Sequence, residues 1–553
     1  MQKNENPQAC APNMQNYEEA YRVFKLDVPE FYNFGLDTVD RWAEDPAKLA
    51  LYWIGDNGTE KQITFAEIKE LSDRFAKALL ASGLRKGDRV LLVMGRVPEW
   101  FVSLLGMLKA GVVAVPGTTQ LAPKDILYRF HAAHCKAAVV GSDIVPRVDS
   151  VREQCPELKL LVCLGTAPAP WRQFETFLSS GDPQLKLDRT KSSDDALVYF
   201  SSGTTGNPKM VLHTHASYPL GHDLTGRFWL DLRPEDLHWN LSDTGWAKAA
   251  WSSFFGPWSQ GACIFVAQMS GKFQPAQVLG MLQKYPITTL CAPPTALRVI
   301  VQENLKEYRF PCLRHCVSAG EPLNPEVMEI WKQATGLTLY DGYGQTETVC
   351  LIGNFRCLPV KPGAMGKPMP GFDIGIIDDD GNELPVGKEG HIAVRTKPNR
   401  PIGLFQEYLA APDLNATAFR GDWYITGDRA VRDSEGYLWF VGRADDVIIT
   451  AGYRVGPFEV ESALIEHPAV VEAAAVAKPE AIRGHIIKAY VVLAPDYKPS
   501  EELVRELQEH VKSLTAPYKY PREIEFLKEL PKTISGKILR RELRDRAAAH
   551  HDN

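Results

Sequence analysis

The sequence predicts a large N-terminal domain, part α/β and part β-rich, followed by a smaller α+β domain. Three observations predict this organisation. The 553 residues exceed the roughly 250–300 residues at which a single hydrophobic core stops growing. Helix and strand patterns alternate through the first part of the chain. The texture then changes twice, near Gly363 and near Arg443.

The first part of the chain alternates between helices and strands. Apolar residues such as Phe65, Ile68 and Leu71 recur near helical spacing, which predicts a helix over residues 64–84. The next apolar run is short and continuous, as in a buried strand. The same reasoning predicts a helix over residues 98–110 and strands over residues 89–94, 111–116, 137–140, 160–164 and 196–200.

From about Gly363 onward, short strands alternate with turn signals, which indicates a β-rich subdomain. Beyond Arg443 the elements become a smaller α+β set. Helices are expected over residues 458–466 and 501–513, with a strand over residues 486–493. We therefore expect two domains, residues 1–444 and residues 445–553.

Composition and charge exclude several classes of function. Hydrophobic residues make up 45% and charged residues 24%, the balance of an ordinary globular protein. A formal charge of −6 provides no basic field for a phosphate backbone, so no nucleic-acid partner is expected. No run approaches about 18 consecutive apolar residues, so no membrane span is expected. The oligomeric state stays open between monomer and homodimer.

The cysteines and the first thirty residues bear on the compartment. Ten cysteines lack the paired spacing of a disulfide framework and suit reduced thiols. The first thirty residues lack both an apolar signal core and the Arg-rich, acid-poor character of a transit peptide. The sequence therefore predicts a cytoplasmic location.

Residues 199–210, Tyr-Phe-Ser-Ser-Gly-Thr-Thr-Gly-Asn-Pro-Lys-Met, predict a loop that holds phosphates. Glycines allow close backbone approach, hydroxyls donate hydrogen bonds, and Lys209 adds a positive charge. It is not a Walker loop, because Met210 rather than Ser or Thr follows Lys209. Taken alone, the segment also fits a Ser/Gly-rich surface turn. We expect His213 and His215, just after it, to pack beneath the loop.

Four further motifs follow in order. They are residues 340–348 (Tyr-Asp-Gly-Tyr-Gly-Gln-Thr-Glu-Thr), 426–428 (Thr-Gly-Asp), 442–446 (Gly-Arg-Ala-Asp-Asp) and 531–537 (Pro-Lys-Thr-Ile-Ser-Gly-Lys). Together with the loop, they resemble the adenylate-forming superfamily of acyl-CoA synthetases, luciferases and nonribosomal adenylation domains. Five ordered motifs make this resemblance specific. Residues 483–493 and 513–521 resemble, more closely, its medium-chain acyl-CoA synthetase branch.

The resemblance implies an AMP-forming acyl-CoA ligase that uses ATP, coenzyme A and Mg2+. Its partner would be a small-molecule carboxylic acid, medium-chain, branched or ring-bearing. The acid is first activated as an acyl-adenylate, with release of pyrophosphate, and the acyl group then passes to the coenzyme A thiol. The small domain would be mobile and would rotate about a hinge at Asp445.

The resemblance also assigns roles within the nucleotide site. Lys537 is the expected catalytic lysine, Thr346 would contact the α-phosphate, and Glu347 would hold Mg2+ through a carboxylate oxygen. Standing alone, Glu347 would fit a solvated surface acid and Lys537 a member of a solvated basic helix. The remaining phosphate-binding residues expected are Ser201, Ser202, Gly203, Thr204, Thr205, Gly206 and Lys209.

Adenine and ribose are expected to meet a second set of residues. The Tyr343 ring would stack on adenine, Asp428 would accept from both ribose hydroxyls, and Arg443 would reach the ribose or a phosphate. The last two also fit a structural ion pair. The other residues of the adenine pocket would be Gly320, Glu321, Pro322, Asp341 and Gly342.

Coenzyme A and the acyl chain are assigned in the same way. Trp246 would form a wall of the acyl pocket, and Gly344 would leave room for a longer chain. Trp251 and Trp258 fit either this pocket or the core. The coenzyme A contacts expected on the small domain are Gly452, Tyr453, Arg454, Arg483, Lys519 and Tyr520.

Other functions stay open. The acceptor could be the thiol of a carrier protein or, as in luciferases, oxygen, and the acid could be short-chain. A catalytically inactive acyl or nucleotide sensor is a further alternative. The presence of Lys209, Glu347, Asp428 and Lys537 favours an active enzyme.

Overall fold

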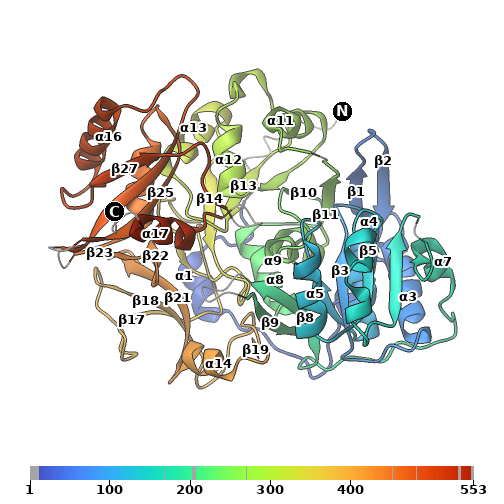
Figure 1. Cartoon of the computed structure of the whole chain (residues 1–553). Helices are drawn as coiled ribbons and strands as arrows, with labels where there is room; N and C mark the ends of the chain where they lie inside the picture. Colours follow the sequence, from blue (N-terminus) through green and yellow to red (C-terminus); the bar gives the residue numbers. More distant parts are fainter. Residues whose placement is uncertain are drawn as a thin grey trace.

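The computed structural model describes residues 11–166, 168–201, 207–269, 271–450, 453–480, 483–532 and 537–549. It contains a large unit of mixed sheets and a smaller C-terminal α+β unit (Figure 1). The predicted fold class is therefore confirmed. Among the described residues, no helix is both long and apolar enough to cross a membrane.

One sheet of the large unit carries the predicted phosphate loop. Within the described residues it has eight strands in the order β19-β9-β8-β4-β3-β5-β6-β7, mostly parallel around β3. Its strands are β3 (Arg89–Val93), β4 (Val113–Pro116), β5 (Cys135–Gly141), β6 (Leu160–Leu164), β7 (Arg172–Gln173), β8 (Asp195–Ser201), β9 (Lys209–Thr214) and β19 (Glu407–Tyr408). Its helices are α3 (Phe65–Ala81), α4 (Pro98–Ala110), α5 (Pro123–Ala132), α6 (Val145–Asp149) and α7 (Phe174–Ser179).

A second sheet carries the predicted adenine-binding segments. The part of the chain described gives it nine strands in the order β16-β15-β14-β13-β12-β10-β11-β1-β2. Its strands are β1 (Leu49–Ile54), β2 (Glu60–Thr64), β10 (Leu237–Asn240), β11 (Cys263–Ala267), β12 (Thr289–Cys291), β13 (His315–Ala319), β14 (Leu339–Tyr343), β15 (Ile352–Gly353) and β16 (Lys367–Pro368). Its helices are α8 (Pro219–Leu224), α9 (Ala247–Ala250), α10 (Gly256–Ser259), α11 (Pro275–Lys284), α12 (Pro294–Ile300) and α13 (Pro325–Thr335).

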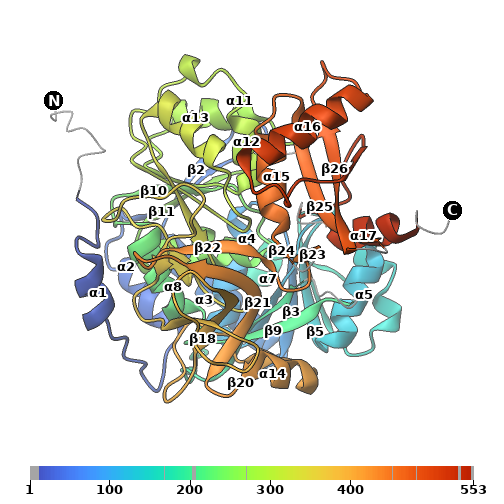
Figure 2. The ribbon, with the colours of Figure 1, turned by 90° about the vertical axis from the view of Figure 1, so that its left-hand side faces the viewer.

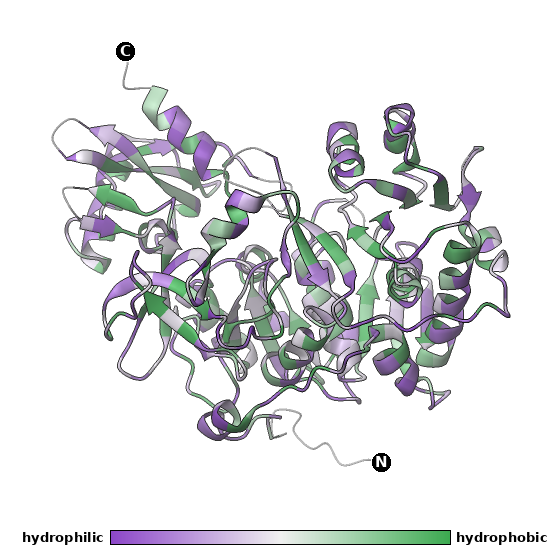
Figure 3. Cartoon of the chain, turned by 90° about the horizontal axis from the view of Figure 1, so that it is seen from below, coloured by the Kyte–Doolittle hydropathy of each residue, from purple (hydrophilic) through white to green (hydrophobic). Residues whose placement is uncertain are grey.

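A shared hydrophobic core joins these two sheets. Trp100 and Phe101 of α4 pack against Phe254 and Trp258, and all four side chains are buried. Aromatic side chains bury large apolar areas, so this cluster fixes α4 between the sheets. Figure 3 shows hydrophobic residues along the interior strands and hydrophilic residues on the outer helices.

The β-rich part follows as five strands, counted over the described residues. They are β17 (Ile374–Ile377), β18 (Glu389–Arg395), β20 (Phe419–Arg420), β21 (Trp423–Arg432) and β22 (Leu438–Arg443), with α14 (Pro412–Ala418) alongside. The predicted turns contain Gly381 at φ 91° and Gly436 at φ 86°, in the left-handed region where glycine has no steric penalty.

The C-terminal unit lies against one end of the large unit (Figure 1 and Figure 2). Its two hydrophobic clusters draw their buried members from residues 448–547. Its elements are β23 (Ile448–Thr450), β24 (Tyr453–Val455), α15 (Pro457–Ile465), β25 (Val470–Glu480), β26 (Gly484–Leu493), α16 (Glu501–Leu514), β27 (Glu523–Phe526) and α17 (Arg540–Ala549).

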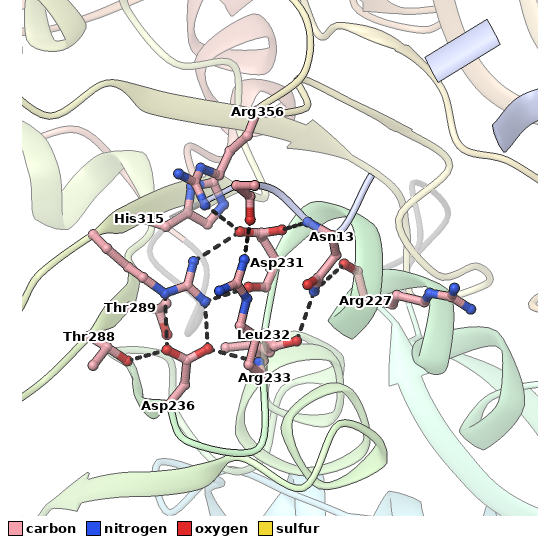
Figure 4. Close-up of polar contacts among 12 residues, drawn as sticks. Asn13, Arg227, Asp231, Leu232, Arg233, Asp236, Thr288, Thr289, His315 and Arg356 are labelled. Atoms are coloured by element: carbon pink, nitrogen blue, oxygen red, sulfur yellow. Dashed lines mark hydrogen bonds and ion pairs between the residues drawn. The ribbon is translucent and has the colours of Figure 1, made fainter. Parts of the chain in front are cut away.

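The N-terminal segment, with α1 (Tyr17–Val23) and α2 (Asp40–Trp42), is tied to the second sheet by a buried polar network (Figure 4). The backbone N–H of Asn13 donates to Asp231 Oδ1 at 2.6 Å. Arg314, just before β13, pairs with Asp231 at 2.9 Å and with Asp236 at 2.5 Å. Because Arg356 also pairs with Asp231, at 2.6 Å, four separate segments are fixed around one carboxylate.

The predicted elements all occur, with small differences at their ends. The strand predicted over residues 111–116 begins at Val113, because Gly111 caps α4 in the left-handed conformation at φ 69°. The helix predicted over residues 64–84 ends at Ala81. Its start is set by Thr64, whose side chain forms a capping box with Glu67.

Candidate functional site

A cavity of about 560 Å³ lies where the large unit meets the C-terminal unit. Such a volume suits a small-molecule or nucleotide site. The predicted site residues on its lining are Ser201, Lys209, Gly320, Glu321, Pro322, Asp341, Gly342, Tyr343, Gly344, Thr346, Glu347, Asp428, Arg443 and Lys537. The structure therefore brings residues from four of the predicted motifs and from the ends of the loop into one cavity.

The ends of the phosphate loop face each other across a strand pair. Ser201, at the end of β8, pairs with Lys209, at the start of β9. Lys209 Nζ lies 5.2 Å from the centroid of the Tyr408 ring, whose face favours a cation. The predicted residues Ser202, Gly203, Thr204, Thr205 and Gly206 lie outside the described residues.

The residues predicted to bind adenine lie at one edge of the second sheet. Strands β13 and β14 are parallel neighbours, so Gly320 and Gly344, which follow them, meet at their common carboxyl edge. Gly320 has φ 106°, a backbone conformation that favours glycine. Glu321 is held by an ion pair with Arg298 of α12, at 3.3 Å.

A buried tryptophan supports two of the predicted adenine-binding residues. The indole N–H of Trp229 donates to the backbone carbonyl of Asp341 at 3.3 Å. A Cβ atom on Gly342 would lie only 2.5 Å from the Trp229 ring, so glycine is required there. Burial raises the pKa of Asp341 to about 8, since the apolar surroundings disfavour its charged form.

Asp428, the predicted ribose carboxylate, is positioned by protein hydrogen bonds. The Tyr343 hydroxyl and the Gln345 side-chain amide both donate to Asp428 Oδ2, each at 2.6 Å. Gln345 is held in turn by donating to Thr426 O and by accepting from the Tyr424 hydroxyl. Burial raises the pKa of Asp428. The hydrogen bonds from Tyr343 and Gln345 and the positive charge of Arg443 oppose this rise.

Arg443 lies directly opposite Asp428 in the ladder between β21 and β22. The two residues predicted to meet the ribose are therefore neighbours on adjacent strands. This arrangement fixes their spacing by backbone pairing rather than by flexible side chains.

Thr346 and Glu347 follow β14 and are held by their neighbours. The Tyr408 hydroxyl donates to Glu347 Oε1 at 2.9 Å, and the Phe405 N–H donates to the Glu347 carbonyl at 2.8 Å. Among the described residues, no group of three or more His, Cys, Asp or Glu side chains could hold a metal ion. A single oriented carboxylate nevertheless fits Mg2+, which is commonly bound by one carboxylate, waters and substrate phosphates.

Lys537 reaches the same cavity from the C-terminal unit. Its positive charge acts on Asp428, where it opposes the rise in pKa that burial causes. The predicted catalytic lysine is thus close to the nucleotide-binding residues in this conformation.

The predicted hinge at Asp445 is bounded by contacts on both sides. Just before it, the Ala444 N–H donates to the Gly427 carbonyl at 2.9 Å. Just after it, Asp446 forms an ion pair with Arg544 of α17, and the same guanidinium donates to Asp445 O at 3.4 Å. The helix α17 thus contacts both Asp445, the predicted hinge, and the residue that follows it.

The structure does not bring the described members of the predicted coenzyme A set into the cavity. Arg454 pairs with Glu389 of β18 at 3.9 Å, Lys519 with Glu459, and Arg483 with Glu480 at 3.6 Å. The other two described residues of this set lie on the same unit, where Tyr453 is 53% exposed and Tyr520 accepts from Arg522 at 2.8 Å. Gly452 lies outside the described residues.

The surroundings of Gly344 differ from the predicted open acyl pocket. A Cβ atom on Gly344 would lie 2.4 Å from the Trp251 ring and 2.3 Å from the Val349 carbonyl. The space beside Gly344 is therefore filled by Trp251, which is 4% exposed and donates to the Tyr218 hydroxyl. Trp246 is half-buried at the start of α9, whereas Trp258 is a core residue.

Gln345, Tyr408 and Trp229 support predicted site residues but were not themselves predicted. Gln345 lies inside the recognised motif. The one sequence signal for its role is its side-chain amide, which can both donate and accept hydrogen bonds. Tyr408 follows Glu347 by 61 residues, and Trp229 precedes Asp341 by 112. No sequence pattern indicated these long-range pairings.

The comparisons with known proteins agree with this geometry. The family model of AMP-binding enzymes matches residues 39–409, and the model of the AMP-binding enzyme C-terminal domain matches residues 459–537. The chain belongs to the AMP-binding enzyme family. The resemblance recognised in its motifs, including the medium-chain acyl-CoA synthetase branch, is confirmed.

The relatives match over nearly their full length. Human acyl-coenzyme A synthetase ACSM3, mitochondrial (Homo sapiens), is 49% identical over 551 residues, which is 98% of this chain and 94% of the relative. Rat ACSM4, mitochondrial (Rattus norvegicus), is 48% identical, with 98% and 95% covered. The crystal structure of the anthranilate CoA ligase AuaEII with anthranoyl-AMP aligns with a TM-score of 0.87 and 31% identity, covering 95% of this chain and 99% of that one.

The predicted cytoplasmic location is wrong. The human and rat relatives, matched over 98% of this chain, are mitochondrial enzymes. The prediction rested on reduced cysteines and on the first thirty residues. Reduced thiols do not distinguish one reducing compartment from another.

Proposed function

We propose that this protein is an AMP-forming acyl-CoA ligase, which activates a carboxylic acid with ATP and transfers the acyl group to coenzyme A. The observation that carries the proposal is the position of Lys537. This lysine, from the C-terminal unit, lines the same cavity as Lys209, Thr346 and Asp428 from the large unit. That combination provides a phosphate contact, a ribose contact and a cation for the reacting phosphoryl group.

In the first half-reaction the acid's carboxylate attacks the α-phosphorus of ATP, and pyrophosphate leaves. A carboxylate is ionised at neutral pH and needs no general base, so alignment and charge neutralisation dominate. Asp428 and Tyr343 hold the nucleoside, while Thr346 and Lys537 contact the oxygens of the α-phosphate. Because the site is partly enclosed, these charges act more strongly than they would in water.

Mg2+ is proposed as the metal, held by Glu347 and the phosphates, where it supplies positive charge. Tyr408 then orients the Glu347 carboxylate toward the phosphates. Lys209, above the ring of the same tyrosine, is directed toward the outer phosphates.

In the second half-reaction the coenzyme A thiol attacks the acyl carbonyl, and AMP leaves. We propose that the small domain, residues 445–553, turns about Asp445 to exchange Lys537 for the coenzyme A surface. The observed exclusion of Arg454, Lys519 and Arg483 from the cavity supports this, since coenzyme A needs a different arrangement.

We propose a medium-chain, branched or ring-bearing acid. Trp251, against Gly344, forms the wall that limits the chain, and Trp246, half-buried before α9, is proposed as a second part of this wall. The AuaEII structure, solved with anthranoyl-AMP, supports ring-bearing acids. We also propose a mitochondrial compartment, on the basis of the relatives.

A panel of acids tests the proposal. Short-chain, medium-chain, branched and aromatic acids are incubated with ATP and Mg2+, with and without coenzyme A, and AMP and thioester are measured. We expect AMP to accumulate only when coenzyme A is present, with an equal amount of thioester. AMP formed at the same rate without coenzyme A would refute coenzyme A as the acceptor.

A further inference from the structure

A fully buried histidine contacts the backbone of the predicted α-phosphate residue. His213 lies in β9, four residues after Lys209, and has no exposed surface. Its Nε2 atom lies 2.8 Å from the Thr346 carbonyl. Because a carbonyl can only accept, Nε2 carries the hydrogen and donates it.

The ring of His213 is fixed from its other sides. It stacks on the Tyr218 ring, with centroids 3.8 Å apart and an interplanar angle of 27°. Its Nδ1 atom lies 3.4 Å from the Ser217 hydroxyl. Burial lowers the pKa of His213 to about 3, so the ring is neutral and keeps one tautomer in the working pH range.

The hydrogen bond from His213 fixes the peptide between Thr346 and Glu347, the predicted α-phosphate and Mg2+ residues. The Thr346 carbonyl and the Glu347 N–H share one peptide plane, which is rigid. The carbonyl of the next peptide accepts from the Phe405 N–H at 2.8 Å. Two successive peptide planes are thus held, one by His213 and the other by Phe405.

We propose that His213 is a positioning residue for adenylation, which holds the Thr346–Glu347 peptide in place through its Nε2–H. It also connects this peptide to β9, the strand that begins with Lys209. The inference rests on the proposed function, because Thr346 has its role only if ATP is the substrate. A shift of about 1 Å at such a position costs on the order of 10²-fold in rate.

The Tyr218 side chain, which stacks on His213, also contacts the proposed wall of the acyl pocket. The Tyr218 hydroxyl accepts from the Trp251 indole N–H at 3.0 Å, and the Trp251 ring lies against Gly344. The Tyr218 ring therefore contacts both the histidine that positions Thr346 and the proposed wall of the acyl pocket. This contact places His213 where a change in its ring would affect the reacting groups rather than only the core.

A matched pair of amide variants tests the proposal. His213→Gln places an amide N–H at the same number of bonds from the backbone as Nε2, whereas His213→Asn is one bond too short to reach the Thr346 carbonyl. We expect ATP–pyrophosphate exchange, which reports adenylation, to fall about 10–100-fold in His213→Asn. His213→Gln should recover most of this rate. The loss should lie in kcat, with little change in the KM for ATP.

Three further measurements separate positioning from stability. His238→Asn removes another buried, hydrogen-bonded histidine, whose Nδ1 lies 2.7 Å from the Thr289 hydroxyl, and should lower the Tm without lowering exchange. Thioester formation from supplied acyl-adenylate should stay near the wild-type rate in His213→Asn. His213→Leu, which is apolar and suits burial, should show the same loss of exchange.

Two results would overturn the proposal. One is an equal loss of exchange in the Gln and Asn variants, and the other is an equal loss in both half-reactions. Failure of the proposed function would look different, because the wild-type protein itself would then form no AMP with any acid.

Discussion

The large unit and the C-terminal unit differ in how their predicted functional side chains are held. On the large unit, Asp428 and Glu347 are buried and accept hydrogen bonds from neighbouring side chains. On the C-terminal unit, Arg454 and Lys519 are partly exposed and pair with carboxylates away from the cavity. The predicted nucleotide residues of the large unit are therefore held in place by hydrogen bonds, whereas the predicted coenzyme A residues Arg454 and Lys519 are paired with other carboxylates.

The largest effect is expected at Lys537, which reaches the cavity from the C-terminal unit. Lys537→Ala should reduce ATP–pyrophosphate exchange about 10²–10³-fold, because the developing phosphoryl charge loses its cation. Thioester formation from supplied acyl-adenylate should be retained. Lys528→Ala, at an exposed position on the same unit, is the control. Equal loss in both half-reactions would show that Lys537 does not act on adenylation alone.

The next largest effect is expected at Gln345, which donates to Asp428 on the large unit. Gln345→Leu removes a donor to Asp428 and leaves Thr426 O and the Tyr424 hydroxyl without this partner. A hydrogen bond to a charged group is worth about 1.5–3 kcal/mol, so kcat/KM for ATP should fall about 10–100-fold. Gln333→Leu, on the exposed face of α13, should leave it unchanged. An unchanged ATP dependence in Gln345→Leu would disprove this support of the ribose carboxylate.

A smaller effect is expected at Glu347. Tyr408→Phe removes the hydroxyl that orients the carboxylate; because Glu347 keeps its charge and loses only this orientation, Mg2+ binding should weaken by about 1 kcal/mol, or about fivefold. The measurement is the Mg2+ concentration for half-maximal exchange, which should rise. Tyr437→Phe, whose hydroxyl donates to Pro359 O, provides the control. If half-saturation does not move, Tyr408 has another role.

The smallest effect is expected at Arg454, a predicted coenzyme A contact on the C-terminal unit. Arg454→Ala should raise the KM for coenzyme A, and Glu389→Gln, which releases Arg454, should lower it slightly. An exposed pair is worth up to about 1 kcal/mol, so each change should stay within about fivefold. Exchange without coenzyme A should be unaffected in both variants. Changes of the same sign in both variants would contradict a competition between Glu389 and coenzyme A.

The sequence predicted the fold well where local patterns decide it. The helix over residues 98–110 and the strand over residues 160–164 occur with the predicted bounds, because continuous apolar runs end at clear turn residues. Motif residues such as Lys209, at the start of β9, and Asp428, within β21, both line the cavity.

What could not be predicted depends on the three-dimensional packing. Tyr408 and Trp229 act on residues far away in sequence, and neither lies in a recognised motif. Gly344 was interpreted as empty space, although Trp251 occupies it. Apolar spacing shows that a tryptophan is buried, but it does not show which neighbour the ring contacts.

The bonding of Asp428 has a consequence for nucleotide choice. Its Oδ2 atom already accepts from Tyr343 and Gln345, so the two ribose hydroxyls would share the remaining oxygen. A nucleotide that lacks the 2′-hydroxyl would then lose part of a shared interaction rather than a separate hydrogen bond. We therefore expect 2′-deoxy-ATP to serve as a substrate with only a modest loss of kcat/KM, since the 3′-hydroxyl can still donate to Oδ1.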